Sequence, residues 1–279
     1  MTSDIDAFTS PTLKHLRESW WDDDFTEFLS ETLKPRPGKR ILDVGCGEGL
    51  GEISIGRLHI SQIRLVGIDL ILSKVVEARR RTTAHNQRVG FAAADACHLP
   101  FAGGSFDSLY CVAVLQHIGD VRSAVGEFAR VTARNGRIVA VVPDNAARYV
   151  FSSVPSGARA FAAASAFFAL VTAARSDKAD TTIGPKLAGL FAQHGIEPVA
   201  VRLFPVSSVA LGPLPSDVWA ARRASVENAL TQIASAEAQA AARSYQAALD
   251  AYEADARTAG TTFVEIQNTM LFAAVGQKE

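Results

Sequence analysis

The sequence has few cysteines and no excess of basic charge, and both features narrow the classes of protein that it can encode. Only three of its 279 residues are cysteine, and none of them forms a Cys-x-x-Cys pair. Neither a disulfide framework nor a zinc-binding pattern is indicated. Lysine and arginine total 28 against 29 aspartates and glutamates, a formal net charge of −1. This balance gives no long-range attraction to a nucleic-acid backbone, and we expect no nucleic-acid partner.

The chain also has no pattern typical of export or of a membrane span. Asp4 and Asp6 stand where a signal peptide would carry positive charge ahead of an apolar core. The longest uncharged apolar run, residues 160–174, is bounded by arginines and is shorter than the roughly 18 residues of a membrane span. We expect this run to form a buried or pocket-lining helix, with no membrane span in the chain.

The three cysteines, Cys46, Cys97 and Cys111, suit a reducing compartment, and we expect a cytoplasmic protein. Their spacing matches no metal site. Small buried side chains are therefore expected at these positions, and no metal is predicted.

Glycines at alternating positions follow a short apolar run at residues 41–44. The run is typical of a buried strand, and Gly45, Gly47 and Gly49 come directly after it. Glycines allow positive φ and leave no Cβ in the way, so loop N–H groups and the following helix N-terminus can face a polar ligand. The dinucleotide pattern Gly-x-Gly-x-x-Gly fits in no register, and no Gly-Lys-Ser or Gly-Lys-Thr closes a P-loop.

The motif that does fit is Asp43-x-Gly45-x-Gly47-x-Gly49 with a second acid, Asp69, at the end of the next apolar run. It resembles the cofactor loop of class I S-adenosylmethionine-dependent methyltransferases. Residues 92–101, 106–118 and 134–143 then resemble the adenine loop, fourth strand and following strand of the ubiquinone/menaquinone-methyltransferase-like branch, methyltransferase domain type 11. The resemblance covers about residues 40 to 145.

This resemblance implies S-adenosyl-L-methionine as the cofactor. It places Asp69 on the ribose hydroxyls and Asp95 near the adenine amino group, and it pairs Asp43 with the loop N–H groups and the cofactor's ammonium. Asp69 as a helix N-cap and Asp95 as a turn residue are the alternatives. The expected cofactor-binding residues are Asp43, Gly45, Cys46, Gly47, Gly49, Asp69, Leu70, Asp95, Ala96, Val112 and Gln116.

His117 follows the fourth expected strand, where the family brings the chain close to the transferred methyl. A histidine titrates near neutral pH and is the candidate general base for an oxygen or nitrogen acceptor. A capping or packing role for His117 is the alternative, and His98 is interpreted as structural.

Strand and helix patterns alternate through the middle of the chain, which indicates an α/β fold. We predict a Rossmann-like, doubly wound, seven-stranded, mostly parallel sheet with added helical cap segments. Ligands of such sheets bind outside the carboxyl ends of the strands. The expected strands lie near 40–45, 64–69, 89–94, 106–112, 136–142, 198–209 and 263–275.

We expect a single methyltransferase domain over residues 1–279. Residues 216–259 contain no glycine or proline and would span about 65 Å as one helix, so a break into two packed helices is predicted. This insertion is either a substrate cap or the surface of a homodimer. The expected parts are N-terminal helices at 1–38, the cofactor-binding core at 39–145, helical caps at 146–180 and 213–260, and sheet-completing segments at 181–212 and 261–279.

Several side chains outside the motifs have two interpretations each. Trp20 and Trp21 either cover the cofactor as a lid or pack on the first strand. Arg79, Arg80 and Arg81 are expected to form a solvated helix face. Four apolar residues that suggest an apolar or aromatic small-molecule acceptor, or else plain core, are Phe161, Phe167, Phe168 and Leu170.

The sequence therefore predicts a methyltransferase acting on a small molecule, with the accepting atom undetermined. A sensor or assembly protein that binds S-adenosylmethionine or S-adenosylhomocysteine without turnover is the alternative. A nicotinamide-dependent reductase is disfavoured because the dinucleotide pattern is absent.

Overall fold

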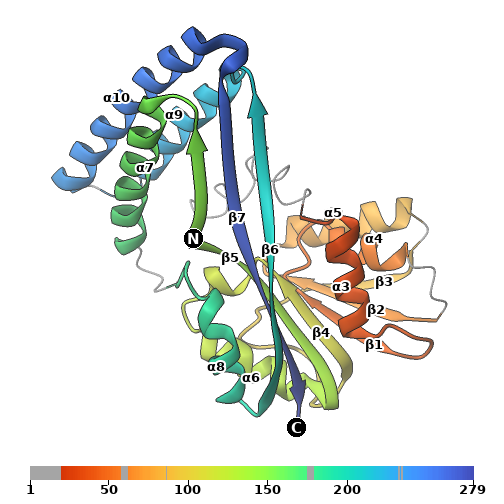
Figure 1. Ribbon diagram of the computed structural model, residues 1–279. Coiled ribbons are helices and arrows are strands. Elements are labelled where there is room, and N and C mark those ends of the chain that lie inside the picture. The colour runs from red at the N-terminus through yellow and green to blue at the C-terminus, as the bar shows by residue number, and fades with distance from the viewer. Residues whose placement is uncertain (1–19, 58–61, 86, 175–178, 232, 234) are drawn as a thin grey trace. The chain divides into compact units, whose positions relative to one another are not determined.

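The structure is a computed structural model that describes residues 20–57, 62–85, 87–174, 179–231, 233 and 235–279 (Figure 1). Its sheet has seven strands in the order β3-β2-β1-β4-β5-β7-β6. The strands are β1 Arg40–Val44, β2 Arg64–Asp69, β3 Val89–Ala93, β4 Phe106–Val112, β5 Thr132–Ser152, β6 Ile196–Leu211 and β7 Val264–Lys278. The helices are α3 Asp23–Leu33, α4 Leu50–Gly56, α5 Leu72–Ala84, α6 Val121–Val131, α7 Pro155–Ala173, α8 Leu187–Ala192, α9 Ser216–Leu230 and α10 Ala236–Ala259, with short 3₁₀ turns η1 Leu115–His117, η2 Gly184–Lys186 and η3 Gly260–Thr262.

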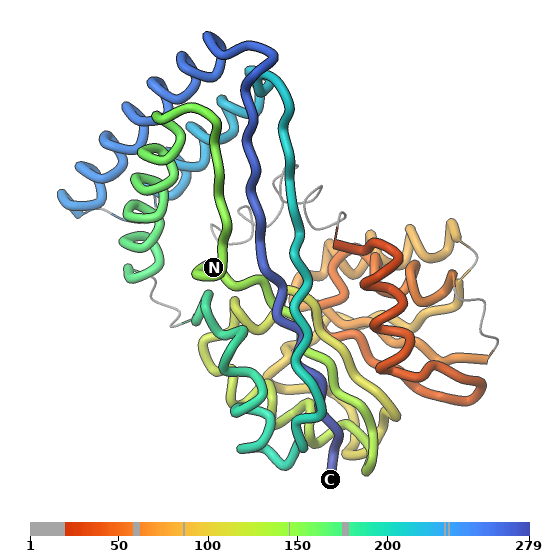
Figure 2. Tube along the Cα trace, viewed as in Figure 1, coloured from red at the N-terminus to blue at the C-terminus, as the bar shows by residue number. Residues whose placement is uncertain are grey.

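The order of the strands confirms the predicted doubly wound fold. β1 pairs in parallel with both β2 and β4, and Leu42 lies opposite Val66 on one side and Leu109 on the other. The chain winds outward from β1 to β3 and then returns to start β4 beside β1, so the winding reverses between β1 and β4. In Figure 1 the β7 arrow runs against those of β5 and β6, and Figure 2 shows its trace between theirs. The carboxyl ends of β1 and β4 are therefore the expected ligand-binding edge.

Both faces of the sheet are covered because successive strand residues point to opposite sides. Leu42 and Leu109 belong to a buried cluster with Val125 and Phe128 of α6. On the other face, the Ser108 hydroxyl donates to the carbonyl of Leu33 at the end of α3, 3.0 Å away. These contacts join α6 to one face of the sheet and the end of α3 to the other.

The helix α3 begins where the sequence places three consecutive aspartates. The Asp22 carboxylate caps the helix by accepting the Phe25 N–H at 2.8 Å, and Lys34 ends it with a positive φ of 48°. Phe25 and Leu29 are fully buried under this helix. Trp20, predicted to be a lid or a packing residue, is 5% exposed, which supports the packing interpretation.

The described residues divide into two compact units. Unit 1 takes those numbered up to 146, 178–204 and 270–279, and unit 2 takes those numbered 147–177 and 205–269. The boundaries fall inside β5, β6 and β7. The cofactor motif therefore lies wholly in unit 1, and the long helices of the two predicted caps lie in unit 2.

Unit 2 has a hydrophobic core of its own, formed between α7, α9 and α10 around Trp219, Tyr252 and Phe263. The predicted break of the long helical segment is confirmed, since α9 ends at Leu230 and α10 begins at Ala236. The break lets residues of both helices pack in one core with α7, which a single straight helix would not allow.

The four apolar residues offered as acceptor-pocket lining pack inside unit 2 instead. The ring of Phe161 lies 5.6 Å from that of Tyr252, and Phe167 and Phe168 lie 6.4 and 6.1 Å from Tyr245. Leu170 is half-buried on the same helix. The alternative interpretation, plain core, therefore describes Phe167, which is fully buried, whereas Phe168 is 36% exposed and Phe161 is half-buried.

The helix α7 is longer than the sequence suggested, because it begins at Pro155 rather than after Arg159. Proline suits the first turn of a helix, where its missing N–H is not needed. At 19 residues, α7 is long and apolar enough to cross a membrane, judged by length and composition alone. Of its most apolar stretch of 18 residues, 22% is buried inside the protein. One helix of this kind is weak evidence for a membrane span, and the absence of a span stays a prediction. Its buried side, with Ala160 and Phe167, packs in the core that it shares with α10.

A buried ion pair joins the parts of unit 2. Arg222 of α9 donates two hydrogen bonds to the Glu265 carboxylate of β7, at 3.0 and 2.5 Å, and the Tyr252 hydroxyl donates a third at 2.7 Å. Burial acts to raise the pKa of Glu265, but the bonds and charge of Arg222 outweigh it and hold the pKa below its usual value. The pair fixes α9 and α10 against β7 because leaving one partner alone would strand a buried charge.

Candidate functional site

The glycine loop after β1 has a different requirement at each glycine. Gly45, Gly47 and Gly49 all have positive φ, at 79°, 53° and 83°. A Cβ at Gly45 would overlap the Val114 side chain, and one at Gly49 would lie 3.2 Å from the Ala78 backbone of α5. No atom lies within 4 Å of a Cβ built on Gly47. Two of the glycines therefore permit close packing, and the middle one lies beneath open space that a ligand can enter.

Asp69, at the end of β2, anchors this loop. Its Oδ2 accepts the Gly47 N–H at 3.0 Å, and its Oδ1 accepts the Ile71 N–H at 2.9 Å. Each carboxylate oxygen keeps a further lone pair, so the same group can also accept bonds from two ligand hydroxyls. The neighbouring Leu70 side chain is 74% exposed beside the loop. The predicted acid and glycines are thus brought together by direct bonds.

Asp43 is placed differently from the prediction, which paired its carboxylate with the loop N–H groups. The N–H groups of Gly45 and Cys46 bind the Ile68 carbonyl at 2.7 and 2.8 Å, and that of Gly47 binds Asp69. Asp43 is 4% exposed and points beneath the loop. A Cβ on Gly51 would lie 2.9 Å from Asp43 Oδ2 and 2.6 Å from the Tyr110 hydroxyl. The loop amides are occupied by neighbours on β2 because that strand ends directly beside them.

A second buried carboxyl, Glu52 of α4, lies with Asp43. Burial raises the pKa of Asp43 to about 8; the nearby Tyr110 and Glu52 side chains oppose this rise, and the charge of Asp69 adds to it. Burial and then the charge of Asp43 raise the pKa of Glu52 well above its usual range. Both carboxyls are therefore expected to hold protons near neutral pH.

The stability of the cofactor-free protein should fall as pH rises from about 4 to about 8. Within that window the folded protein holds the Asp43 proton, whereas the unfolded chain loses it at the usual pKa of 3.8. The folded state thus binds more protons, and the free energy of unfolding declines with pH until the folded-state pKa is passed. Urea unfolding at a series of pH values measures this slope.

Asp43→Asn removes the titrating group and should flatten the slope, leaving the part contributed by Glu52. Glu197→Gln is the matched control, because Glu197 is exposed and its loss should leave the slope unchanged. A wild-type slope retained in Asp43→Asn would show that Asp43 is ionised in the folded protein.

Sequence reasoning missed three side chains at this site. Glu52 is a carboxyl inside the apolar stretch Leu50–Ile55, and that mismatch was a detectable signal. Tyr110 was only included in the expected strand 106–112, and its hydroxyl position depends on the pairing of β1 with β4. Glu48 of the loop binds Arg81 of α5 at 3.3 Å. The prediction that Arg79, Arg80 and Arg81 form a solvated face is therefore wrong for Arg81.

Asp95 serves the turn that the sequence analysis gave as the alternative. Its Oδ1 accepts the Cys97 N–H at 2.8 Å, and its Oδ2 lies 3.3 Å from Nδ1 of the exposed His98. Ala96, next to it, is half-buried. The carboxylate remains half-exposed, and a contact between Asp95 and adenine stays a prediction.

The end of β4 places Gln116 and His117 in a 3₁₀ turn. Gln116 is 3% exposed, and its Nε2 lies 3.1 Å from His117 Nε2. In that orientation the Gln116 amide N–H donates to the imidazole. If the amide group is turned over, its oxygen accepts a hydrogen bond from the imidazole N–H instead. Either way Nε2 of His117 is engaged by Gln116, and the general-base and packing roles of His117 both stay predictions. Val112 is half-buried and pairs with Val141.

The described residues offer no set of three or more histidine, cysteine or acidic side chains arranged for a metal ion. Cys46 and Cys111 are buried and Cys97 is half-buried, all as free thiols. Burial raises the pKa of Cys97 to about 11, with the charges of Asp95 and Asp120 adding to it. These thiols are thus expected to be neutral near pH 7 and to serve as packing groups.

Comparison with known proteins finds similarity to methyltransferases over the part of the chain that holds this site. Residues 42–140 match the family described as "Methyltransferase domain". Over 108 residues the chain is 36% identical to an O-methyltransferase of Pyrenophora dematioidea, covering 38% of this chain and 40% of the relative. It is 31% identical over 137 residues to the 27-O-demethylrifamycin SV methyltransferase of Amycolatopsis mediterranei, covering 45% of this chain and 50% of that one. The chain thus spans half or less of these curated relatives.

A solved structure supports the fold over a longer stretch. The geranyl diphosphate C-methyltransferase of Streptomyces coelicolor, in complex with S-adenosyl-L-homocysteine, superposes with a TM-score of 0.51. The match covers 91% of this chain and 75% of that protein at 14% identity. At this identity the likeness shows the fold alone.

Proposed function

Because residues 42–140 match a methyltransferase domain, we propose that this chain transfers the methyl group of S-adenosylmethionine to an oxygen atom of a small molecule. The observation that carries the proposal is the glycine loop itself, with open space over Gly47 and the Asp69 carboxylate beside it. This loop combines exposed backbone with a carboxylate acceptor, as a ligand with a polar chain and a ribose diol requires.

The cofactor supplies a methyl group that is already activated by its leaving group, so the protein's task is alignment. Placing donor and acceptor in line accounts for much of the acceleration in such a reaction. Asp69 would hold the ribose, and Gly47 would let the methionine portion approach the backbone. The neutral carboxyls of Asp43 and Glu52 would support the loop from below, since a buried charge there would need a partner.

An oxygen acceptor is proposed because both curated relatives carry O-methylation in their names. An acceptor hydroxyl must lose its proton during or after transfer. His117 is the candidate base that the sequence motif predicts for this step. For that role its Nε2 must exchange Gln116 for the acceptor, which a rotation of the Gln116 side chain would allow.

The proposal is tested by incubating the protein with S-adenosylmethionine and a panel of phenols, alcohols, amines, thiols and quinones. Release of S-adenosylhomocysteine with hydroxyl compounds, and its absence with the others, is the expected result. Release only with amines or thiols would show that nitrogen or sulfur, and not oxygen, accepts the methyl group.

A protein that binds the cofactor without turnover is the competing function. It would gain thermal stability from S-adenosylmethionine, as the enzyme would, but would release no S-adenosylhomocysteine with any compound. A rise in the unfolding midpoint with NAD and none with S-adenosylmethionine would contradict both functions.

A further inference from the structure

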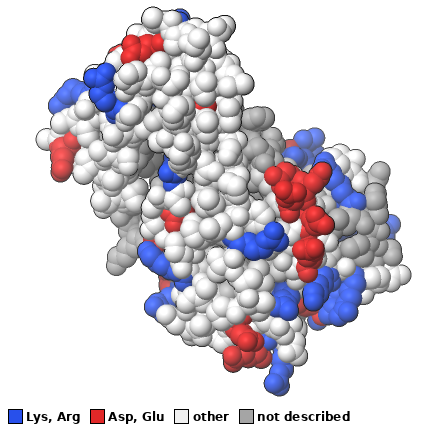
Figure 3. All heavy atoms as spheres, in the orientation of Figure 1, with Lys and Arg blue, Asp and Glu red and all other residues white. Residues whose placement is uncertain are grey.

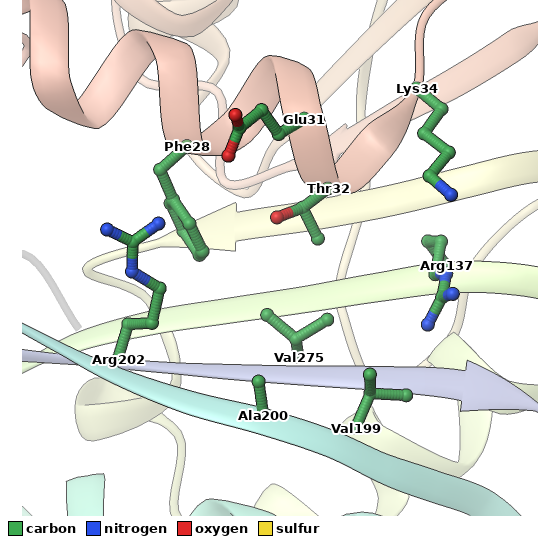
Figure 4. Close-up of a pocket in the computed structure, with 9 residues that line it drawn as sticks. All are labelled: Phe28, Glu31, Thr32, Lys34, Arg137, Val199, Ala200, Arg202 and Val275. Atoms are coloured by element: carbon green, nitrogen blue, oxygen red, sulfur yellow. The ribbon is translucent and has the colours of Figure 1, made fainter.

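Unit 1 has a pocket of about 250 Å³ that none of the cofactor motifs line. It lies between the last turns of α3 and the strands β5, β6 and β7 (Figure 4). Arg137 of β5 is opposite Ser108 at the start of β4, whereas the cofactor loop follows the carboxyl end of β1. The lining residues are Phe28, Glu31, Thr32, Lys34, Arg137, Val199, Ala200, Arg202 and Val275.

Three cations line this pocket against one carboxylate. Lys34, Arg137 and Arg202 have no ion-pair partner within 4.0 Å among the residues that the structure describes. In Figure 4 the Lys34 ammonium points toward Arg137, and the Glu31 carboxylate lies toward Phe28. In Figure 3 acidic side chains gather over α3, and basic ones lie beside them. One end of the pocket therefore carries two positive charges with no negative group between them.

The Arg137 guanidinium provides the second observation. Its Nη1 is buried and has no hydrogen-bond partner within the described part of the chain. A buried donor of a charged group normally makes a hydrogen bond, because burial removes its bound water and an unbonded donor then has no replacement for it. The N–H groups of this guanidinium suit a tetrahedral oxyanion, since guanidinium binds phosphate through two parallel bonds.

The other end of the pocket is apolar. Arg202 stacks over the rings of Phe28 and Phe204, at 5.2 and 5.3 Å from their centroids. Val199, Ala200 and Val275 form the remaining wall (Figure 4). An apolar wall does not stabilise a free inorganic ion, but it can pack against the organic part of a larger ligand.

We propose that this pocket is a binding site for a small phosphate monoester, with the phosphate on Lys34 and Arg137 and its organic group along β6 and β7 toward Phe28. A phosphate monoester carries a charge of about −1.5 to −2 near pH 7 and matches the combined charge of Lys34 and Arg137. A carboxylate matches only half of this charge. The site is separate from the proposed methyl transfer and does not depend on it.

The experiment is calorimetric titration of the full chain with phenyl phosphate, inorganic phosphate and benzoate. Phenyl phosphate should bind most tightly, because it alone satisfies both ends of the pocket. Arg137→Gln and Lys34→Gln should each weaken it about 10-fold or more, the loss expected for a bond between charged groups. Glu31→Gln should tighten it, since a like charge is removed.

Arg88→Gln is the matched control, because Arg88 is exposed near β3 and lines no part of this pocket. It should leave phenyl phosphate binding unchanged. Each variant is also titrated with S-adenosylhomocysteine, whose affinity should stay at the wild-type value and so report an intact unit 1. Equal phenyl phosphate affinity in wild type and Arg137→Gln, or no binding to wild type, would overturn the proposal. Tighter binding of inorganic phosphate than of phenyl phosphate would also overturn it, because the apolar wall would then take no part.

Discussion

Replacing Asp69 with alanine should weaken the binding of S-adenosylhomocysteine by about 10²-fold to 10⁴-fold. Two hydrogen bonds to a charged acceptor contribute about 1.5 to 3 kcal/mol each, and each 1.4 kcal/mol is a factor of ten in affinity. The loss should be at the upper end, because the same carboxylate also holds the Gly47 N–H at 3.0 Å and thus shapes the loop. Isothermal titration calorimetry measures the change directly.

A ligand lacking the ribose hydroxyls separates the two effects of this substitution. Wild-type protein should bind a 2′,3′-dideoxy analogue more weakly than S-adenosylhomocysteine, and Asp69→Ala should bind the two about equally. If Asp69 acts only by holding the loop, the variant will discriminate between them as well as wild type does. Glu197→Ala, which removes an exposed carboxylate, is the charge-matched control. Unchanged affinity in Asp69→Ala would remove this residue from the site.

Replacing His117 with alanine should lower kcat by about 10²-fold or more while leaving cofactor affinity near the wild-type value. General-base catalysis by a positioned side chain contributes an effect of this size when an acceptor hydroxyl must be deprotonated. Histidines titrate near pH 6.5 as a rule, so wild-type kcat should rise with pH through that region. The variant should lose this rise, and steady-state kinetics between pH 5 and 9 would show it.

The contact between Gln116 and His117 Nε2 makes this prediction discriminating. If the contact is purely structural, His117→Ala will keep the wild-type pH profile and its kcat will change little. In that case methyl transfer proceeds by alignment alone. His85→Ala is the control, because His85 is an exposed histidine at the end of α5 whose Nδ1 lies 2.9 Å from the Arg81 carbonyl. It should match wild type in both kcat and pH profile.

The sequence by itself determined the fold of the cofactor core and the identity of its loop. An apolar run such as Ile41–Val44 followed by alternating glycines has few physical solutions, because a buried parallel strand must end in a tight turn with positive φ. Asp69 was recoverable for the same reason, since the end of a neighbouring parallel strand lies beside that turn. The strand, the turn and the convergence of the strand ends follow from local periodicity and from the regular geometry of parallel sheets, whereas the identity of the loop rests on its resemblance to the methyltransferase family.

Only the tertiary structure decided what surrounds those residues. Asp43 was expected on the loop amides, but Ile68 and Asp69 occupy them, and the buried neighbours of Asp43 come from α4 and β4. The aromatic residues of α7 fit a ligand pocket or a core equally well in sequence, until α10 supplied Tyr245 and Tyr252 as their partners. The pocket lined by Lys34 and Arg137 joins residues about a hundred positions apart. A sequence records which side chains are apolar or charged, whereas burial, partner and protonation depend on segments that meet only when the chain folds.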